Sequence, residues 1–220
     1  LGFFSAFDSP AKNYQDGIVI HAASVGEVIA LTPFVEKLLL QYAHLPITVT
    51  TFTPTGSAQV KKQFGDRVFH SFLPLDALPC TQLFLARLQP KLIIFMETEL
   101  WPNLISQCAN KKIKLLLING RLSANSIKSY QKISALIKPS LQHFDKILCQ
   151  SQENLIRFIQ LGARTEQCEL SGNLKYDICI NENTMLKQAA LAELLPKNRT
   201  LWLVASTHQG DEDIALSAFR

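Results

Sequence analysis

Short apolar runs alternate with segments of helical apolar spacing from residue 18 onward, and this alternation strongly limits the folds open to the chain. The runs are rich in Leu and β-branched residues and show little polar alternation, which is typical of strands covered on both faces. Repeated strand–helix units of this length predict a parallel, doubly wound α/β sheet with right-handed crossovers. We expect strands at 18–21, 47–52, 68–72, 92–96, 114–118, 146–149 and 201–205.

The composition fits a globular protein with a sizeable core, because 47% of the 220 residues are hydrophobic and 18% are charged. The formal net charge of +4 is a mild excess that suits an anionic ligand or a membrane surface. It is too small to indicate nucleic acid binding, and no nucleic-acid-binding motif accompanies it. We therefore expect no nucleic acid partner.

The cysteines are odd in number, and no two of them have C-x-x-C spacing. This pattern predicts reduced core thiols in a cytosolic compartment and no metal site. No run of about 18 apolar residues occurs, so the sequence predicts no membrane-spanning helix. The five residues are Cys80, Cys108, Cys149, Cys168 and Cys179.

A polar stretch after Asp177 separates two parts of the chain. We expect a Rossmann-like domain at 1–177, a linker with a short helix at 178–199, and the first strand–helix unit of a second such domain at 200–220. A single unit cannot bury both of its faces, so we expect the natural protein to be longer.

The first predicted strand ends at a small-residue turn that opens a helix. Ser24 and Gly26 suit this turn, and Glu27 falls in the first helical turn. Ligands of open α/β sheets bind where strand carboxyl ends meet helix N-termini, so Glu27 is a candidate catalytic base. Ser24 and Glu27 also have the S-x-x-E spacing of a capping box, in which Glu27 would accept a hydrogen bond from the Ser24 N–H. Both roles fit the residues.

Polar clusters follow three other predicted strands. Thr53, Thr55 and Gly56 could hold an anion at a helix N-terminus, although an N-cap cluster with a Pro-Thr-Gly turn is the simpler interpretation. Glu97 and Glu99 could bind sugar hydroxyls or a partner arginine, or could be first-turn residues favoured by the helix dipole.

Arg121 follows the fifth predicted strand and is placed either to form an ion pair with one of these two carboxylates or to meet an anionic substrate. The ion pair is the favoured interpretation. The stretch 206–208 opens a later helix, where a phosphate could bind. His208 could equally be a surface histidine.

Six stretches together resemble the 3-deoxy-D-manno-octulosonic acid (Kdo) transferases of lipopolysaccharide core biosynthesis. Each stretch alone is a weak signal, but the six occur in the family's order and cover nearly the whole chain. They are HAASVGE at 21–27, TFTPTG at 51–56, ETELWPN at 97–103, NGRLS at 119–123, GNLKYD at 172–177 and STH at 206–208.

The resemblance implies an inverting, metal-independent, cofactor-free glycosyltransferase of the GT-B type, with the acceptor-binding domain first. The donor would be CMP-Kdo and the acceptor the lipid A precursor, lipid IVA. Glu27 would be the general base. The resemblance places Ser24, Gly26, Thr53, Thr55, Gly56, Glu97, Glu99 and Arg121 in acceptor binding or in shaping the site, and Lys175, Ser206, Thr207 and His208 in donor binding.

The resemblance also implies a location at the cytoplasmic face of the bacterial inner membrane, either peripheral or through an N-terminal anchor helix that this chain lacks. We expect the chain alone to be inactive, because the second domain is incomplete. Lys61, Lys62, Arg67 and the lysines at 111, 112 and 114 could meet anionic head groups or acceptor phosphates, or could be solvated charges.

Two other functions remain open. One is a different GT-B glycosyltransferase with another acceptor. The other is a non-catalytic Rossmann-like binding module, which the absence of G-x-G-x-x-G at the first turn counts against.

Overall fold

The computed structural model describes residues 14–177 and 182–219. The chain divides into two units, residues 1–178 and residues 179–220. The predicted domain boundaries at 177 and 199 stay predictions.

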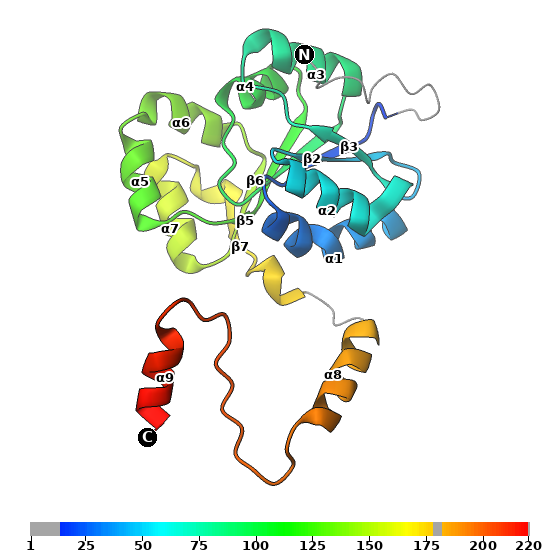
Figure 1. Ribbon diagram of the computed structural model, residues 1–220. Coiled ribbons are helices and arrows are strands. Elements are labelled where there is room, and N and C mark those ends of the chain that lie inside the picture. Colours follow the sequence, from blue (N-terminus) through cyan, green and yellow to red (C-terminus); the bar gives the residue numbers. More distant parts are fainter. Residues whose placement is uncertain (1–13, 178–181, 220) are drawn as a thin grey trace. The chain divides into compact units, whose positions relative to one another are not determined.

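The first unit is built on one seven-stranded sheet in the order β3-β2-β1-β4-β5-β6-β7 (Figure 1). Every neighbouring pair of strands is parallel, as the repeated strand–helix pattern predicts. The strands are β1 (Ile18–His21), β2 (Ile47–Thr51), β3 (Phe69–Phe72), β4 (Leu92–Met96), β5 (Lys114–Gly120), β6 (Lys146–Cys149) and β7 (Cys168–Leu170).

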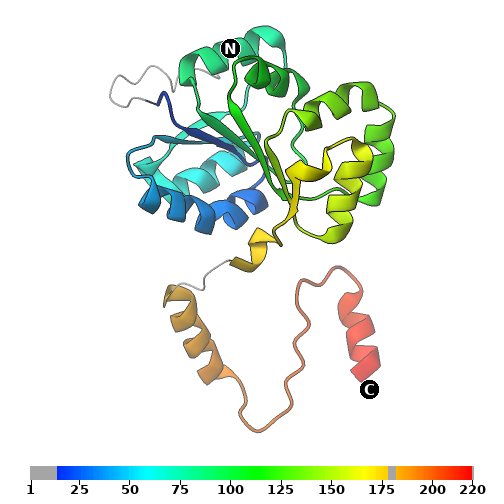
Figure 2. The same ribbon diagram turned by 180° about the vertical axis from the view of Figure 1, so that it is seen from behind.

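Helices cover both faces of this sheet (Figures 1 and 2). The connecting elements are α1 (Val25–Gln41), α2 (Pro54–Phe64), η2 (Gly65–Arg67), α3 (Leu78–Leu88), α4 (Pro102–Asn110), α5 (Ala124–Gln131), α6 (Ser134–Gln142), α7 (Gln152–Leu161), η3 (Thr165–Gln167) and η4 (Leu174–Asp177). The helices α1 and α2 cover one face, where Leu31 and Phe64 are buried with Ile20 and Val49 of the sheet. The helices α3, α4, α6 and α7 cover the other face, which has its own buried cluster. The fold is therefore the predicted doubly wound, Rossmann-like α/β architecture.

Strand β1 lies at the point where the strand order reverses. It pairs with β2 on one side, where Ile20 faces Val49, and with β4 on the other, where Ile20 faces Ile94. Parallel strands in this register end at the same edge of the sheet, so the turns after β1 and β4 emerge side by side. Open α/β sheets bind ligands at this kind of switch point.

The seventh strand, β7, is absent from the sequence-based prediction. It has only three residues, Cys-Glu-Leu, and only Cys168 is buried. An edge strand this short lacks the apolar run that marks the others.

The second unit contains α8 (Glu182–Leu194) and α9 (Asp211–Phe219). The predicted strand at 201–205 is wrong: the backbone there forms no strand. A strand needs a hydrogen-bonding neighbour, and every strand among the described residues belongs to the sheet of the first unit. Trp202 instead stacks on Phe219 of α9, with ring centroids 5.7 Å apart.

The four cysteines within the described ranges are free thiols, and Cys179 lies outside those ranges. Burial raises the pKa of Cys108 and Cys149 to about 12 and that of Cys168 to about 11, so these thiols are inert core groups. Across 14–177 and 182–219, no helix combines the length and the apolar character needed to cross a membrane.

Gly17, which leads into β1, is required by a close backbone approach. A Cβ added there would lie 2.0 Å from the Pro46 carbonyl oxygen, which already accepts the Ile18 N–H. We expect Gly17→Ala to lower the free energy of unfolding by about 2–4 kcal/mol, because neither backbone segment can move away.

The matched control is Gly26→Ala in α1, where the nearest atom to an added Cβ is 4.0 Å away. This change should stabilise the helix by about 0.5–1 kcal/mol. Urea unfolding midpoints compare the two variants. A Gly17→Ala protein as stable as the Gly26→Ala protein would show that the approach at Pro46 is not restrictive.

Candidate active site

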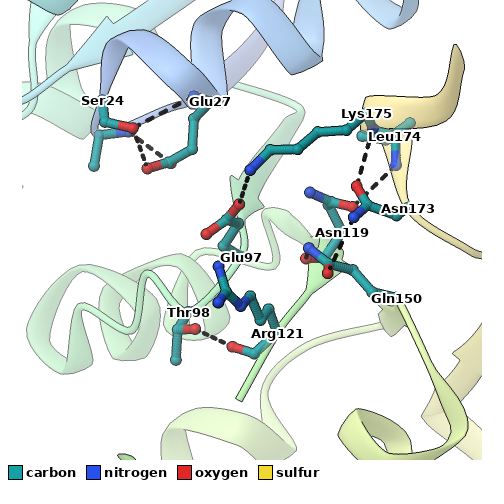
Figure 3. Close-up of polar contacts among 11 residues, drawn as sticks. Ser24, Glu27, Glu97, Thr98, Asn119, Arg121, Gln150, Asn173, Leu174 and Lys175 are labelled. Carbon is teal, nitrogen blue, oxygen red and sulfur yellow. Dashed lines mark hydrogen bonds and ion pairs between the residues drawn. The ribbon is translucent and has the colours of Figure 1, made fainter. Parts of the chain in front are cut away.

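The turns after β1, β4 and β5, together with η4 after β7, carry the predicted carboxylates and two cations at the carboxyl edge of the sheet. Figure 3 shows Glu27, Glu97, Arg121 and Lys175 of this group. Glu27 lies in the first turn of α1, and Glu97 follows β4 directly. Lys175 of η4 reaches Glu97, with 3.9 Å between Nζ and Oε1. Five of the predicted site residues, Glu27, Glu97, Glu99, Arg121 and Lys175, therefore surround the switch point.

Glu27 is fixed by the turn that opens α1. Ser24 is the N-cap, with an extended backbone, and its Oγ accepts the Glu27 N–H at 3.4 Å. The Ser24 hydroxyl donates to Glu27 Oε1 at 2.9 Å, and the Ala23 N–H donates to Oε2 at 2.9 Å (Figure 3). The expected capping box is thus present in altered form, because the side chain accepts from the Ala23 N–H and not from that of Ser24.

The pKa of Glu27 is raised above its ordinary value. Burial is the main cause, and the nearby Glu97 and Glu99 carboxylates add to it, while hydrogen bonds from Ala23 and Ser24 oppose it. Each carboxylate oxygen has two lone pairs and one described donor, so Glu27 can still accept a proton.

The Glu99 carboxylate contacts two aromatic side chains. Trp101 Nε1 donates to Glu99 Oε2 at 2.9 Å, and His21 Nε2 lies 3.5 Å from the same oxygen. His21 is fully buried, and its Nδ1 is hydrogen-bonded to Thr50 Oγ1 at 3.0 Å. His21 was not among the predicted site residues, although a single histidine at the end of an apolar strand was a visible signal.

Glu97 has an unusual backbone. Its φ is +54°, a left-handed conformation that non-glycine residues rarely adopt. The turn is closed by the Glu99 N–H, which donates to the Met96 carbonyl at 3.2 Å. Such strain is concentrated at functional sites, and here it directs the Glu97 carboxylate toward Lys175.

Arg121 does not form the predicted ion pair with Glu97 or Glu99. Its side chain is exposed and extends toward Glu97 in Figure 3, but no ion pair joins Arg121 to any carboxylate of the described residues. Lys175 takes the partner position on Glu97. The turn that carries Arg121 is fixed by a hydrogen bond from the Thr98 hydroxyl to the Arg121 backbone carbonyl. The guanidinium therefore remains able to bind an anion.

The N-cap predicted for the cluster after β2 is present. Thr53 is the N-cap of α2, and its Oγ1 accepts the Gly56 N–H at 3.1 Å. Thr55 donates its hydroxyl to Thr53 Oγ1 at 3.3 Å. A Cβ on Gly56 would approach Thr51 and Thr53 to 3.1–3.2 Å, so Gly56 serves close packing.

The predicted donor-binding residues Ser206, Thr207 and His208 lie in the second unit, before α9. The Thr207 hydroxyl donates to Glu212 Oε1 at 2.5 Å, and the His208 N–H donates to Asp211 Oδ2 at 2.8 Å. The first turn of α9 is acidic, so carboxylates lie at this helix N-terminus. The donor-binding role of the three residues stays a prediction.

The predicted basic groups lie at the opposite edge of the sheet. Arg67 precedes β3 and forms two hydrogen bonds with the Glu36 carboxylate, at 2.6 and 2.7 Å. Lys114 starts β5 and lies 2.8 Å from Asp145 Oδ1. These amino ends are far from the turns that carry Glu27, so these residues cannot meet a phosphate bound there.

No group of three or more metal-ligating His, Cys, Asp or Glu side chains occurs in the part of the chain that the structure describes.

Sequence comparisons match this chain to one family along most of its length. A family model described as 3-deoxy-D-manno-octulosonic-acid transferase (kdotransferase) matches residues 1–178. The chain is 45% identical over 219 residues to a 3-deoxy-D-manno-octulosonic acid transferase of Haemophilus influenzae, covering 100% of this chain and 51% of the relative. It is 35% identical over 208 residues to the protein of that name from Rickettsia prowazekii, covering 93% and 44%. The chain thus spans about half the length of the curated relatives it matches.

Solved structures show the same fold at low identity. The UDP-GlcNAc 2-epimerase of Neisseria meningitidis is 12% identical with a TM-score of 0.57, over 84% of this chain and 56% of that one. A second UDP-N-acetylglucosamine 2-epimerase gives a TM-score of 0.56 at 12% identity, over 85% and 51%. These likenesses support the Rossmann-like architecture and carry no further conclusion about function.

The raised pKa of Glu27 has a consequence for stability. A carboxyl group with a higher pKa in the folded state binds more protons there than in the unfolded state, so it makes stability fall as pH rises through the folded pKa. Glu27→Gln removes this effect and keeps an oxygen for the Ala23 N–H. We expect the stability of the variant relative to the wild type to increase as pH rises from the ordinary pKa of glutamate through the raised pKa of Glu27, as measured by urea unfolding.

The matched control is Glu36→Gln on the same helix. Glu36 is paired with Arg67, so its loss should give no such gain at neutral pH. A stability difference for Glu27→Gln that does not change with pH would contradict the raised pKa.

Proposed function

We propose a function for this chain from the premise that it belongs to the 3-deoxy-D-manno-octulosonic acid (Kdo) transferase family, whose model matches residues 1–178. Members of this family are glycosyltransferases. The complete protein would transfer Kdo from CMP-Kdo to lipid IVA with inversion at the anomeric carbon, and the first unit would bind the acceptor.

The position of Glu27 carries this proposal. Its carboxylate lies at the switch point of the sheet, has a raised pKa, and keeps free lone pairs on both oxygens. A general base works best when its pKa approaches the working pH, and burial moves Glu27 in that direction. A carboxylate that served only as a helix cap would need neither the burial nor two acidic neighbours.

In the proposed step, an acceptor hydroxyl attacks the anomeric carbon of Kdo from the face opposite CMP. The bond between that carbon and the phosphate oxygen of CMP breaks, and CMP leaves with its electron pair. The proton of the hydroxyl passes to a carboxylate oxygen of Glu27. The Ser24 hydroxyl and the Ala23 N–H hold the carboxylate in place during the transfer.

The remaining charged residues would bind the substrates. Arg121 is exposed and would pair with an anionic group of the acceptor, while Glu97 and Glu99 would accept hydrogen bonds from sugar hydroxyls. Lys175 lies in the first unit beside Glu97, which supports contact with a substrate at this edge. Ser206, Thr207 and His208 remain proposed donor contacts.

We further propose that the complete protein works at the cytoplasmic face of the inner membrane, because its acceptor would be a lipid. The lysines and Arg67 at the amino edge of the sheet do not support this location, since they are distant from the proposed acceptor site. Contact with anionic head groups is better attributed to Arg121 and Lys175 at the carboxyl edge.

Glu27→Gln in the full-length enzyme separates the base from the cap. The amide keeps the helix start, since its oxygen can accept from Ala23 and its NH₂ can donate to Ser24, but it cannot take a proton. We expect a folded protein whose kcat for transfer from CMP-Kdo is lower by about 10²–10⁴-fold. Glu36→Gln is the control and should keep full activity. Near-normal turnover by Glu27→Gln would leave Glu27 as a helix cap.

Arg121→Gln tests the anion contact. Arg121 pairs with no described carboxylate, so the free energy of unfolding should be unchanged. Loss of a charged hydrogen bond to the acceptor should raise the acceptor KM about 10–100-fold with little change in kcat. Arg67→Gln, at the far edge, is the control. An unchanged KM in Arg121→Gln would remove Arg121 from the acceptor site.

Parallel assays with UDP-sugars distinguish a Kdo transferase from another glycosyltransferase of this fold.

A further inference from the structure

His21, the last residue of β1, is a fully buried polar side chain that has no role in the proposed function. The register of the sheet fixes its surroundings, because its Cα partners are Thr50 of β2 and Phe95 of β4. Such partners on parallel strands point to the same face of the sheet. The rings of Phe95 and Trp101 make T-shaped contacts with the imidazole, with centroids 6.2 and 6.1 Å away. Packing therefore sets the plane of the His21 ring.

The partners of the two ring nitrogens indicate which of them carries the proton. Nδ1 lies 3.0 Å from Thr50 Oγ1, and either atom can be the donor in this pair. Nε2 is buried and has no hydrogen-bond partner among the described residues, but Glu99 Oε2 lies 3.5 Å away. A carboxylate oxygen only accepts, so an unprotonated Nε2 would turn its lone pair toward another lone pair. The contact with Glu99 therefore favours a proton on Nε2.

The Thr50 hydroxyl is placed to complete this arrangement. It has a single proton, and two acceptors are within its reach: His21 Nδ1 at 3.0 Å and the Ile20 carbonyl at 3.4 Å. Donation to the nearer Nδ1 leaves Nε2 as the protonated nitrogen of a neutral imidazole. Hydrogen-bond donation then runs from Thr50 through His21 toward Glu99.

The two oxygens of the Glu99 carboxylate have different surroundings. Oε2 accepts the Trp101 Nε1–H at 2.9 Å and also faces His21 Nε2, so both ring N–H groups converge on this one oxygen. No residue that the structure describes forms a hydrogen bond with Oε1, and the Glu99 side chain is 27% exposed. A carboxylate that is held through one oxygen can offer the other oxygen to a ligand.

We propose that His21 is the positioning residue of Glu99: its Nε2–H donates to Oε2, beside the Trp101 N–H, and so directs Oε1 at a hydroxyl group of the bound sugar. Two donors on one oxygen restrict rotation of the carboxylate more than one donor does. The separation of 3.5 Å is long for a hydrogen bond, and such contacts in active sites often tighten when the substrate binds. The inference rests on the proposed function, in which Glu99 accepts a hydrogen bond from a sugar hydroxyl.

The proton on Nε2 can be observed directly in the full-length protein labelled with ¹⁵N-histidine. Long-range ¹H–¹⁵N spectra distinguish protonated from unprotonated ring nitrogens, and the His21 signals are identified by their loss in a His21 variant. We expect Nε2 to carry a proton in the protein without substrate. An unprotonated Nε2 would overturn the inference and would say nothing against the proposed function, since no substrate is involved.

Asparagine and glutamine replace the two ring nitrogens separately. His21→Gln places an amide nitrogen near the position of Nε2 and can still donate to Glu99, whereas the shorter His21→Asn reaches only the position of Nδ1. Both variants lose the packing of the ring, so a purely structural role predicts equal kinetics for the two folded enzymes. We expect His21→Asn to raise the acceptor KM about 3–10-fold with little change in kcat, and His21→Gln to restore it to within about twofold of the wild type. Equal KM values would overturn the role of the Nε2 donor.

Glu99→Gln separates this inference from the proposed function. The amide keeps an oxygen for the Trp101 N–H but removes the charged acceptor, so the acceptor KM should rise about 10–100-fold. A normal KM in Glu99→Gln would contradict the place of Glu99 in the acceptor site, and the inference would fall with it. A raised KM in Glu99→Gln with a normal KM in His21→Asn would overturn the inference alone. If neither His21 variant folds, the protonation of Nε2 in the wild type decides the question.

Discussion

The pairing of β1 with both β2 and β4 is the constraint on which the rest of the site depends. Because all three strands are parallel and in register, their carboxyl ends lie together at one edge. Glu27 and Glu97 are 70 residues apart in the sequence, yet each follows one of the two strands that meet at the reversal. Burial of Ile20 between Val49 and Ile94 therefore also brings the carboxylates together.

Charged side chains are paired at the amino edge of the sheet and mostly unpaired at the carboxyl edge. At the amino edge, Arg67 meets Glu36 and Lys114 meets Asp145 at close distances, so opposite charges compensate each other. At the carboxyl edge, three carboxylates face two cations, and only Lys175 approaches one of them. Burial is the main cause of the raised pKa of Glu27, and the neighbouring Glu97 and Glu99 carboxylates add to it. Natural proteins keep such local instability where a ligand relieves it.

Sequence patterns predicted six of the seven strands and the clustering of the site, because apolar periodicity marks each strand and parallel strands place the turns after them at one edge. They failed where a feature depends on a distant partner. The Arg121 ion pair was predicted from proximity, but Lys175 of η4 occupies the position on Glu97. The pairing of β5 with β6 shifts between Leu117 and Gly120, which β5 alone cannot reveal. The 201–205 segment has strand-like residues but no neighbouring strand.

The most direct test of Glu27 as the base is the pH dependence of kcat/KM for transfer by the full-length enzyme. The acidic limb should report a single group whose pKa lies above the ordinary value for glutamate, because burial and the neighbouring carboxylates raise it. This limb should disappear in the residual activity of Glu27→Gln and persist in Glu36→Gln. An acidic limb that is identical in wild type and Glu27→Gln would show that another group takes the proton.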